Sequence, residues 1–384
     1  MNRPRRLRIA VLNRHFGAHF GGAERYSVAL VEQLASRHDI HVFAQHAEFG
    51  SFGGITFHRV PCPFAKPRWI NQLWYATWTW WKTRHGFDVV HSHENTWHGQ
   101  IQTVHVRPMR VGLFHGRSGI RRALKWLNIV TSPRLIAYWF LEASRFKPHA
   151  NRCIVATSES VCADTLAAYP GAAGMISVIP PGVTLPVAPP EKAARRARLG
   201  LPADVPMALF IGNDYEKKGL PALLKAMASL PPELHLAVVG NSAHIPAFRK
   251  RAEGLGLAGR VHFLGSLNNV EPAYEAADLL VHPTTEDTYA MVVLEALAYG
   301  LPVVVSGPAH CGIAIDLEDG HNALIVDDPR DSRAIAGAVR RILDEPDLAA
   351  RFAAAGRAFA AERGWDVMAE RQESLYLAVC DRRP

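Results

Sequence analysis

The chain has 384 residues, which is more than one typical domain needs and enough for two. Hydrophobic residues make up 48% of it and charged residues 20%, a balance that excludes a disordered protein and predicts a soluble globular one. Its five cysteines show no CxxC or Cys/His ligand spacing, which argues against a disulfide framework or a zinc site and favours a reducing compartment.

Charge is distributed unevenly along the chain. Residues 1–180 hold 22 Lys and Arg against 9 Asp and Glu, a net charge of +13, whereas the remaining residues hold 21 against 26, a net charge of −5. A strongly basic half indicates an anionic partner: membrane lipid, anionic glycolipid or nucleic acid.

The N-terminus begins with a basic run, and the short apolar run of residues 7–12 that follows ends at Asn13. This pattern predicts a buried strand rather than a signal peptide. The apolar runs elsewhere are too short to cross a bilayer, so we expect a cytoplasmic protein.

Short β-rich apolar runs alternate with helical patterns throughout, which is typical of parallel α/β sheets. In the first half the expected strands are residues 7–12, 40–44, 55–60, 88–93, 101–106 and 153–158. In the second half they are residues 207–212, 234–240, 261–266, 278–283, 302–307 and 323–328. Two such series predict two Rossmann-like domains of similar size.

The connection between the first strand and the first helix is rich in glycine. Within residues 13–35, Gly21 and Gly22 precede a helix whose apolar positions have helical spacing: Tyr26, Ala29, Leu30 and Leu34. Glycine lets a backbone approach a ligand closely, and a helix N-terminus offers unpaired amides, although a plain glycine turn fits the same residues. The G-x-G-x-x-G fingerprint of nicotinamide enzymes is not found here, which argues against a dehydrogenase.

Two segments of the first half combine tryptophan with arginine. In residues 68–84 one helical stripe is more typical of a core-facing helix than of a ligand site: Ile70, Leu73, Trp74, Trp78 and Trp81. Three further aromatic residues lie off that stripe: Trp69, Tyr75 and Trp80. The second segment, residues 107–126, holds Arg107, Arg110, Arg117, Arg121, Arg122 and Lys125. Such segments suit a membrane interface or a phosphorylated glycolipid, and a solvated surface is the alternative.

Four histidines cluster around the strands of residues 88–93 and 101–106: His91, His93, His98 and His105. Metal binding is one interpretation of such a cluster, but most clustered histidines are structural. His91, His93 and His98 are interpreted as structural, whereas His105 lies at the end of an expected strand.

The proline-rich stretch of residues 179–206 marks the domain boundary. We expect an N-terminal domain of residues 1–182, a linker of residues 183–204 and a C-terminal domain of residues 205–364. Residues 331–380 have a helical pattern, and residues 365–384 are treated as a separate C-terminal helix.

In the second half, the chain leaves a strand at Gly212, and Lys217, Lys218 and Gly219 lead into a helix. Cations at a helix N-terminus oppose the helix dipole and need a compensating anion. The arrangement therefore favours a phosphate site over two merely solvated lysines.

A pair of carboxylates follows the strand of residues 278–283. Asp287 lies in a loop, and Glu295 lies eight positions later within a helix. Carboxylates accept hydrogen bonds from sugar hydroxyls, and amides at a helix N-terminus favour a phosphate. The amides expected to face the phosphate are those of Tyr289, Ala290 and Met291.

Taken in order, these motifs resemble the retaining GT-B glycosyltransferases of family 4. Asp287 and Glu295 are similar to the acid-x7-acid signature of that family, with Asp in place of the commoner Glu. Tyr289-Ala290 stands where the family has Phe-Gly. The adjacent Glu286 is an alternative first acid.

The other motifs carry the same resemblance. Gly21-Gly22 resembles the family's GG-x-E-R element, and Lys217-Lys218-Gly219 its G-R-x(n)-K-G element, with Asn213 in place of the arginine. His105 is similar to the histidine of T-V-H. Gly182 is similar to the glycine of N-G-V, with Pro181 in place of the asparagine.

The resemblance implies two Rossmann-like domains that face each other across a cleft. The N-terminal domain would bind the acceptor and the C-terminal domain a nucleotide-sugar, and the final helix would pack back on the N-terminal domain. The likeness within the family is greatest to transferases of the bacterial lipopolysaccharide core and of cell-surface glycans. It implies a hexosyltransferase acting on a glycolipid or lipopolysaccharide acceptor, peripheral on the inner face of the cytoplasmic membrane and attracted to its anionic surface.

The same resemblance implies the roles of single residues. His105, Asp287 and Lys218 would be catalytic. Ligand contacts would come from Gly21, Gly22, Gly182, Lys217, Glu286, Tyr289, Ala290, Met291 and Glu295. No cofactor and no metal are expected.

Two other classes of protein remain open at this point. A GT-B-fold nucleotide-sugar epimerase or phosphorylase would share the fold but not the chemistry. A basic nucleic-acid-binding protein would use the +13 half, but aromatic-basic RNA motifs are not found, so no nucleic acid is expected as a partner.

Overall fold

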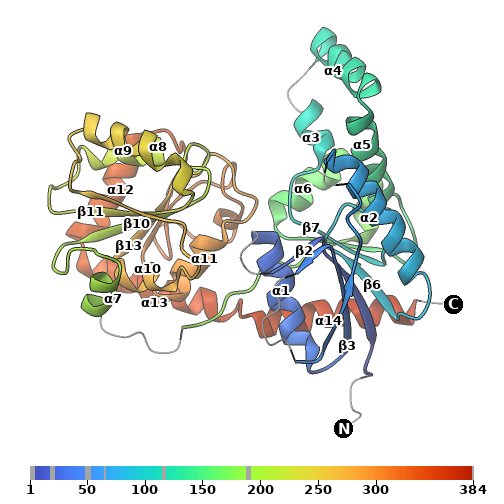
Figure 1. Ribbon diagram of the computed structural model, residues 1–384. Helices are drawn as coiled ribbons and strands as arrows, with labels where there is room; N and C mark the ends of the chain where they lie inside the picture. The colour runs from blue at the N-terminus through green and yellow to red at the C-terminus, as the bar shows by residue number, and fades with distance from the viewer. Residues whose placement is uncertain are drawn as a thin grey trace. The chain divides into compact units, whose positions relative to one another are not determined.

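A computed structural model of the chain describes residues 5–17, 22–47, 53–64, 66–114, 118–186 and 192–382. The chain divides into two compact units (Figure 1). The first comprises residues 1–182 together with 365–384, and the second comprises residues 183–364.

The first unit is built on a parallel sheet with the order β5-β3-β1-β6-β7-β8-β9. Its strands are β1 (Arg8–Leu12), β3 (Asp39–Ala44), β5 (Ile55–Arg59), β6 (Val89–Ser92), β7 (Ile101–Val104), β8 (Cys153–Ala156) and β9 (Ile176–Val178). A small separate pair is formed by β2 (His15–Phe16) and β4 (His46–Ala47).

The helices of this unit are α1 (Gly22–Ala35), α2 (Arg68–Thr83), α3 (Met109–Phe114), α4 (Gly119–Thr131), α5 (Pro133–Arg145), α6 (Glu159–Ala168) and α14 (Trp365–Asp381), with the 3-10 helix η1 (Pro170–Met175). Helices α3, α4 and α5 form an extension of the unit, with α4 at its tip (Figure 1).

The second unit has six parallel strands in the order β12-β11-β10-β13-β14-β15. They are β10 (Met207–Ile211), β11 (His235–Val239), β12 (Val261–Gly265), β13 (Leu279–His282), β14 (Val303–Ser306) and β15 (Leu324–Val326). The helices are α7 (Lys192–Arg198), α8 (Leu220–Met227), α9 (Ile245–Gly254), α10 (Glu271–Ala276), α11 (Met291–Ala298), α12 (Ser332–Asp344) and α13 (Pro346–Ala361), with η2 (Ser242–His244) and η3 (Gly312–Ile315).

The central strands of the second sheet, β10, β13 and β14, are buried at every position, which is why they are mainly apolar. Side chains alternate along β10: Leu209 belongs to one core with α11, and Phe210 to a second core with α8 and α12. The sequence prediction of two Rossmann-like α/β units is confirmed, and each expected strand is present. Strand ends differ by one or two residues, the usual uncertainty of element boundaries.

The stretch expected to be a linker, residues 183–204, belongs to the second unit. Its helix α7 packs on α10, and Arg196 is buried there. The Arg196 guanidinium donates to the carbonyl of Ala276 at 2.8 Å and pairs with Asp278 at 2.8 Å. These bonds fix the start of the second unit to the sheet.

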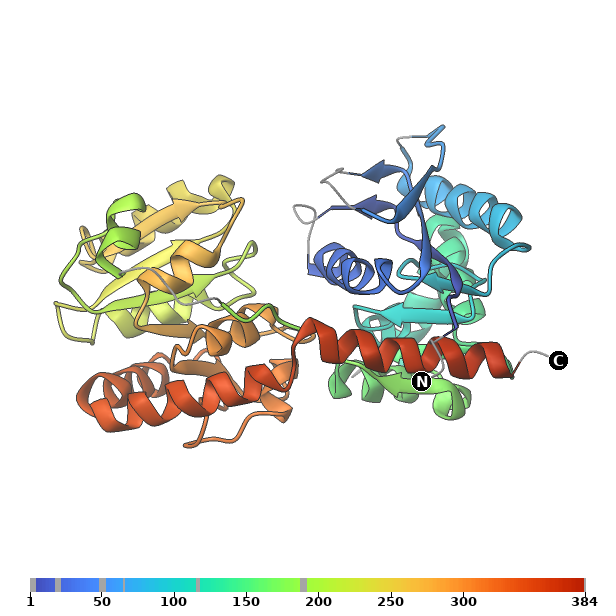
Figure 2. The same cartoon turned by 90° about the horizontal axis from the view of Figure 1, so that it is seen from below.

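Helix α14 returns to the first unit and lies along it (Figure 2). Glu373 of α14 pairs with His38 at 2.9 Å and with Arg37 at 2.5 Å, and Tyr376 bonds His91 at 2.7 Å. Trp365, at the start of the helix, packs edge-on against Tyr26 of α1.

The orientation predicted for α2 is wrong. The expected core stripe includes Trp74 and Trp81, which are exposed, whereas Tyr75, expected to lie off the stripe, is fully buried. The inner face of α2 meets polar groups of β3 and the loop after it. Tyr75 donates to the carbonyl of Phe43 at 2.8 Å, and Asn71 exchanges hydrogen bonds with Gln45. Tyr75 also packs in the apolar core of the sheet, so hydrogen bonding and this packing together select the buried face.

Candidate functional site

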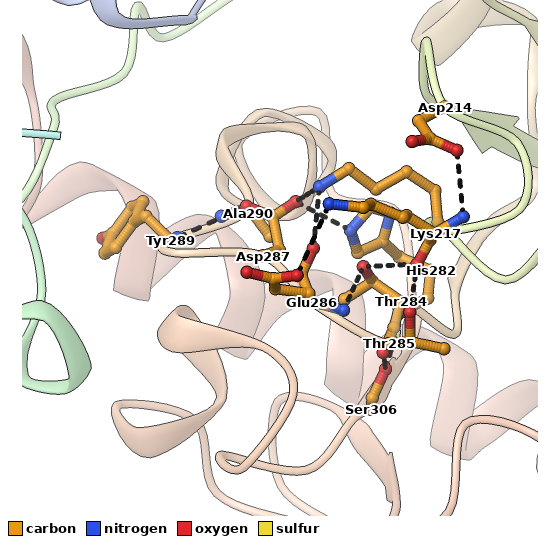
Figure 3. Close-up of polar contacts among 11 residues, drawn as sticks. Asp214, Lys217, His282, Thr284, Thr285, Glu286, Asp287, Tyr289, Ala290 and Ser306 are labelled. Atoms are coloured by element: carbon orange, nitrogen blue, oxygen red, sulfur yellow. Dashed lines mark hydrogen bonds and ion pairs between the residues drawn. The ribbon is translucent and has the colours of Figure 1, made fainter. Parts of the chain in front are cut away.

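The candidate site of the second unit lies where its strand order reverses, between β10 and β13. Ligands bind to doubly wound sheets at the carboxyl ends of the strands at this point. Lys217 and Lys218 follow β10, and Asp287 follows β13, so two segments distant in the sequence meet here (Figure 3).

Two glycines make the lysine turn possible. Gly219, the N-cap of α8, has φ of 83°, and a Cβ on it would lie 1.8 Å from the carbonyl oxygen of Pro283. Gly212 gives room to the stem of Lys218, because a Cβ there would lie 2.8 Å from Lys218 Cγ. Backbone and side chain are therefore packed around the position of Lys218, which holds the ammonium group in place.

Asp287 is the centre of the hydrogen-bond network (Figure 3). Its Oδ2 accepts from Lys218 Nζ at 2.5 Å and lies 3.2 Å from His282 Nε2. Its Oδ1 accepts from the amides of Ala290 at 2.9 Å and Tyr289 at 3.4 Å. A carboxylate has about four acceptor positions, so protein donors engage both oxygens of Asp287 fully.

This environment keeps Asp287 ionised. Burial would raise the pKa of its carboxyl, but the hydrogen bonds and charges of His282 and Lys218 outweigh burial and hold the pKa well below its usual range. Lys218 and Asp287 thus form a fixed ion pair with side-chain exposures of 23% and 16%.

The amides at the start of α11 take a different role from the one expected. Two of the three amides predicted to face a phosphate, those of Tyr289 and Ala290, donate to Asp287 instead. Ala290 has φ of 68°, a left-handed conformation that favours glycine. The resemblance has glycine at this position, and the Asp287 cap explains how alanine is held in the same conformation.

Lys217 and Glu286 lie at the surface of the site. Their side chains are 61% and 51% exposed, and Nζ of Lys217 lies 3.5 Å from Glu286. The backbone beneath them is well anchored, because the carbonyl of Lys217 accepts from the amide of Thr285 at 2.8 Å and from the hydroxyl of Thr284 at 3.2 Å. Lys217 therefore offers an accessible cation on a fixed turn.

Glu295, the second acid, is buried on α11. The hydroxyl of Tyr274, on α10, donates to its Oε2 at 2.5 Å. Tyr274 is itself fully buried and stacks on Tyr299. The orientation of the Glu295 carboxylate is consequently set by a residue that the sequence prediction did not include.

In the first unit, His105 follows β7, and its Nε2 lies 3.1 Å from Nδ1 of His93, which follows the neighbouring strand β6. Tyr26 packs edge-on against the His105 ring at 5.1 Å. Burial, aided by the charge of Arg145, lowers the pKa of His105 to about 3. His105 is therefore a neutral hydrogen-bonding group at physiological pH and not a cation.

The glycines predicted in the first unit have different surroundings. Gly22 begins α1 and has open space around its Cβ position, whereas Gly21 lies outside the described residues. A Cβ on Gly182 would lie 2.7 Å from Cα of Trp365. Gly182 is thus required where the chain leaves the first unit beside the start of α14, and this contact explains the glycine without a ligand.

Of the three histidines interpreted as structural, His91 is fully buried and His93 and His98 are half-buried. His91 bonds Tyr376 and the hydroxyl of Thr103, each at 2.7 Å. Burial, as the largest cause, lowers the pKa of His91 and of His98 to about 3 and that of His93 well below its ordinary value.

These histidines predict acid lability of the first unit. Their folded pKa values lie below the ordinary value of 6.5, so the unfolded chain binds more protons and stability falls as pH drops below about 6.5. All nine tryptophans lie in the first unit, so thermal unfolding followed by tryptophan fluorescence reports on it alone. We expect the melting temperature to fall steadily from pH 7 to pH 4. His98→Gln should reduce the slope, and a flat profile in the wild type would contradict the assignment.

The structure adds residues that sequence reasoning missed. His282 is the last residue of the buried strand β13. A polar residue in an otherwise apolar run is the sequence signal that could have identified it. At the point where the first sheet reverses its strand order, Arg14 and Glu94 form a partly buried pair with Nε and Oε2 3.0 Å apart. Arg14 follows β1 and Glu94 follows β6. A polar residue directly after a strand is the sequence signal that could have identified both.

Two family models match the chain. The model of the glycosyl transferases group 1 matches residues 191–359, and that of glycosyltransferase family 4 matches residues 20–185. Each model therefore covers most of one unit.

Individual proteins are similar over long stretches. The D-inositol 3-phosphate glycosyltransferase of Streptomyces avermitilis is 30% identical over 88% of this chain and 74% of its own length. The lipopolysaccharide glucosyltransferase WaaG of Escherichia coli is 28% identical over 58% of this chain and 61% of its own length.

Solved structures show the same fold. A crystal structure of WaaG, described as a glycosyltransferase involved in lipopolysaccharide biosynthesis, matches with a TM-score of 0.80 at 22% identity, over 96% of this chain and 99% of that one. The Anabaena protein Alr3699/HepE in complex with UDP-glucose matches with a TM-score of 0.71 at 18% identity, over 98% of each chain. The fold of two Rossmann-like units is that of GT-B proteins.

Proposed function

This chain belongs to the group 1 glycosyltransferases of family 4, and from that membership we propose that it transfers a hexose from a nucleotide-sugar to a membrane-associated glycan, with retention of anomeric configuration. The observation that carries the donor part of the proposal is the Lys218–Asp287 pair at the point where the second sheet reverses its strand order. The exposed Lys217 beside it supplies a second cation.

At the donor end, Lys218 and Lys217 are assigned to the diphosphate. Negative charge accumulates on the leaving nucleoside diphosphate as the glycosidic bond breaks, and a cation already fixed in place stabilises that charge without reorganisation. The position of Lys218 Nζ, held by Asp287 at 2.5 Å and by the carbonyl of Glu286 at 3.2 Å, supports this role. With two lysines available for the diphosphate, the proposed mechanism uses no metal ion.

The carboxylates are assigned to hydroxyl groups. Glu295, oriented by Tyr274, is proposed to accept hydrogen bonds from the nucleotide ribose. Asp287 holds Lys218 and the start of α11, and we propose that it faces the transferred sugar by exchanging one of these donors for a hydroxyl. Retention would follow from attack of the acceptor on the same face that the diphosphate leaves. His105, neutral and near the strand ends, is proposed to hydrogen-bond the sugar.

The similar proteins suggest two classes of acceptor, an inositol phosphate and a lipopolysaccharide. The surface of the first unit favours the membrane-associated class. One face of α4 exposes a row of apolar side chains at helical spacing, with exposures between 57% and 79%: Ile120, Leu124, Leu127 and Val130. Arg121 and Lys125 lie on the same helix. An apolar face flanked by cations suits the surface of an anionic bilayer.

Among the described helices, none combines the length and the apolarity that crossing a bilayer requires. We therefore propose peripheral attachment through α4 at the inner face of the cytoplasmic membrane. The protein should float with vesicles that contain anionic phospholipid, and less of it should float as salt rises, because salt screens the basic residues.

A double variant with a matched control tests that surface. Leu124→Ser with Leu127→Ser should reduce flotation strongly, whereas Ile315→Ser, which changes an equally exposed apolar residue of the second unit, should not. Equal flotation with neutral vesicles, or loss with Ile315→Ser alone, would contradict docking through α4.

The transfer activity is tested in two steps. Thermal unfolding with a panel of nucleotide-sugars identifies the donor, since a ligand at about 100 times its Kd adds roughly 2.7 kcal/mol to stability. The donor is then incubated with a lipopolysaccharide-type glycolipid or with inositol phosphate, and the product is examined by NMR. We expect transfer to the glycolipid with an unchanged anomeric configuration. A sugar altered without any acceptor would indicate an epimerase and overturn the proposal.

A further inference from the structure

A second feature of the first unit lies apart from the strand ends. A hollow of about 600 Å³ is formed by the C-terminal half of α5 with the end of α6 and the start of η1, and α3 contributes Arg110 to it. Its walls are mainly apolar, and two of their side chains remain open to solvent, Ile136 at 47% exposure and Phe140 at 54%. The volume lies within the range of sites that bind small molecules.

The far wall of the hollow is held by ring stacking and hydrogen bonds. Phe146 is buried and stacks on Tyr169 with ring centroids 4.7 Å apart. The hydroxyl of Tyr169 donates a hydrogen bond to the carboxylate of Glu142 at 2.9 Å, and Glu142 does not line the hollow. Glu142 also accepts from the backbone amides of Met109 and Arg110, so α3 is tied to this wall. The hollow is therefore preformed rather than dependent on closure.

Cations border the apolar walls. Arg110 and Lys147 line the hollow, and both are exposed. The Arg110 guanidinium lies 5.8 Å from the ring centre of Trp139 and 5.4 Å from that of Tyr169, so it remains at the edge of the aromatic wall. Among the described residues that line the hollow there is no Asp or Glu. An occupant with an apolar body and a negative end matches this distribution.

Helix α4 contacts one wall residue of the hollow. Trp139 of the wall packs against Trp126 of α4, with ring centroids 5.4 Å apart. An amphiphile held by the α4 face would thus have its apolar part next to the mouth of the hollow.

We propose that this hollow binds one acyl chain of an anionic phospholipid, with the phosphate at Arg110 and Lys147. The inference rests on the proposed membrane docking but concerns a different set of residues. It gives the docked protein a preference for a single lipid molecule in addition to attraction to the surface.

Single-chain alkyl phosphates below their micelle concentration test the site by calorimetry on the full chain. Each added methylene buried should tighten binding about fourfold, so decyl phosphate should bind roughly sixteenfold tighter than octyl phosphate. Inorganic phosphate and the neutral octyl glucoside should bind at least tenfold more weakly than octyl phosphate. Equal binding of octyl glucoside, or no dependence on chain length, would overturn the proposal.

Variants locate the binding. Ala143→Phe should block the hollow. Phe140→Ser changes an exposed wall residue and need not alter folding, and it should weaken the binding of decyl phosphate about tenfold or more. Arg110→Gln should weaken the binding of the alkyl phosphates but not that of octyl glucoside. Melting temperatures confirm that each variant is folded, and unchanged affinity in both folded wall variants would place the alkyl phosphate elsewhere.

The same measurements separate this inference from the proposed function. Leu124→Ser with Leu127→Ser, which lie outside the hollow, should lose vesicle flotation yet bind decyl phosphate normally. If the protein failed to transfer sugar, alkyl phosphate binding could still be observed, because the calorimetry contains no sugar donor. Loss of decyl phosphate binding in this folded α4 variant would show that α4, and not the hollow, holds the chain.

Discussion

Lys218→Ala is expected to lower turnover by about 10²-fold or more, the scale of losing one preorganised charge donor. Lys218 Nζ is fixed 2.5 Å from Asp287, on a stem packed over Gly212. Its removal takes away the cation proposed to face the leaving diphosphate. A steady-state transfer assay measures the loss, and circular dichroism should be unchanged because the Lys218 side chain is partly exposed.

Lys217→Ala is the matched control. It removes a lysine from the same turn, but one that is 61% exposed and paired with the exposed Glu286. An exposed cation is less fixed in place and stabilises the leaving diphosphate less, so the effect on turnover should be at least tenfold smaller than for Lys218. If Lys217→Ala proved the more damaging change, Lys218 would not be the residue that faces the diphosphate.

Asp287→Asn should cut transfer as strongly, by about 10²-fold or more, while binding of the free nucleoside diphosphate stays nearly intact. Asparagine keeps the size of the side chain and an oxygen for the amides of Tyr289 and Ala290. The variant loses the negative charge that holds Lys218. The same charge competes with a diphosphate for the Lys218 ammonium group, so its loss need not weaken diphosphate binding. Calorimetry with the nucleoside diphosphate, run beside the transfer assay, separates the two quantities.

The second acid should behave in the opposite way. Glu295→Gln should weaken nucleoside diphosphate binding by about 1.5–3 kcal/mol, the contribution of hydrogen bonds to a charged group. Tyr274→Phe should reproduce a smaller part of the same loss, because Tyr274 orients the Glu295 carboxylate.

Glu286→Gln is the control for both acids. Its carboxylate is 51% exposed and forms an ion pair with the exposed Lys217, so a mild effect is expected. An inactive Glu286→Gln with an active Asp287→Asn would transfer the sugar-facing role to Glu286.

Local patterns in the sequence predicted the elements of the fold well. Continuous apolar runs such as those of β10 and β13 can be recognised without a structure because strands buried on both faces need apolar side chains at every position. The pattern failed for α2, where the buried face is chosen by hydrogen bonds to the carbonyl of Phe43 and to Gln45 and by the packing of Tyr75 in the core of the sheet. Partners outside the helix decided that face, and apolar spacing within the helix carries no information about them.

For the site, the sequence by itself determined which residue types can bind a diphosphate and sugar hydroxyls, and their order along the chain. Only the tertiary structure decided how these residues are paired. Lys218 and Asp287 are 69 positions apart and meet because β10 and β13 are neighbours in the sheet. His91 meets Tyr376 across 285 positions because α14 returns to the first unit. Such contacts depend on strand order and on chain crossing, which are properties of the folded chain and not of any local stretch of it.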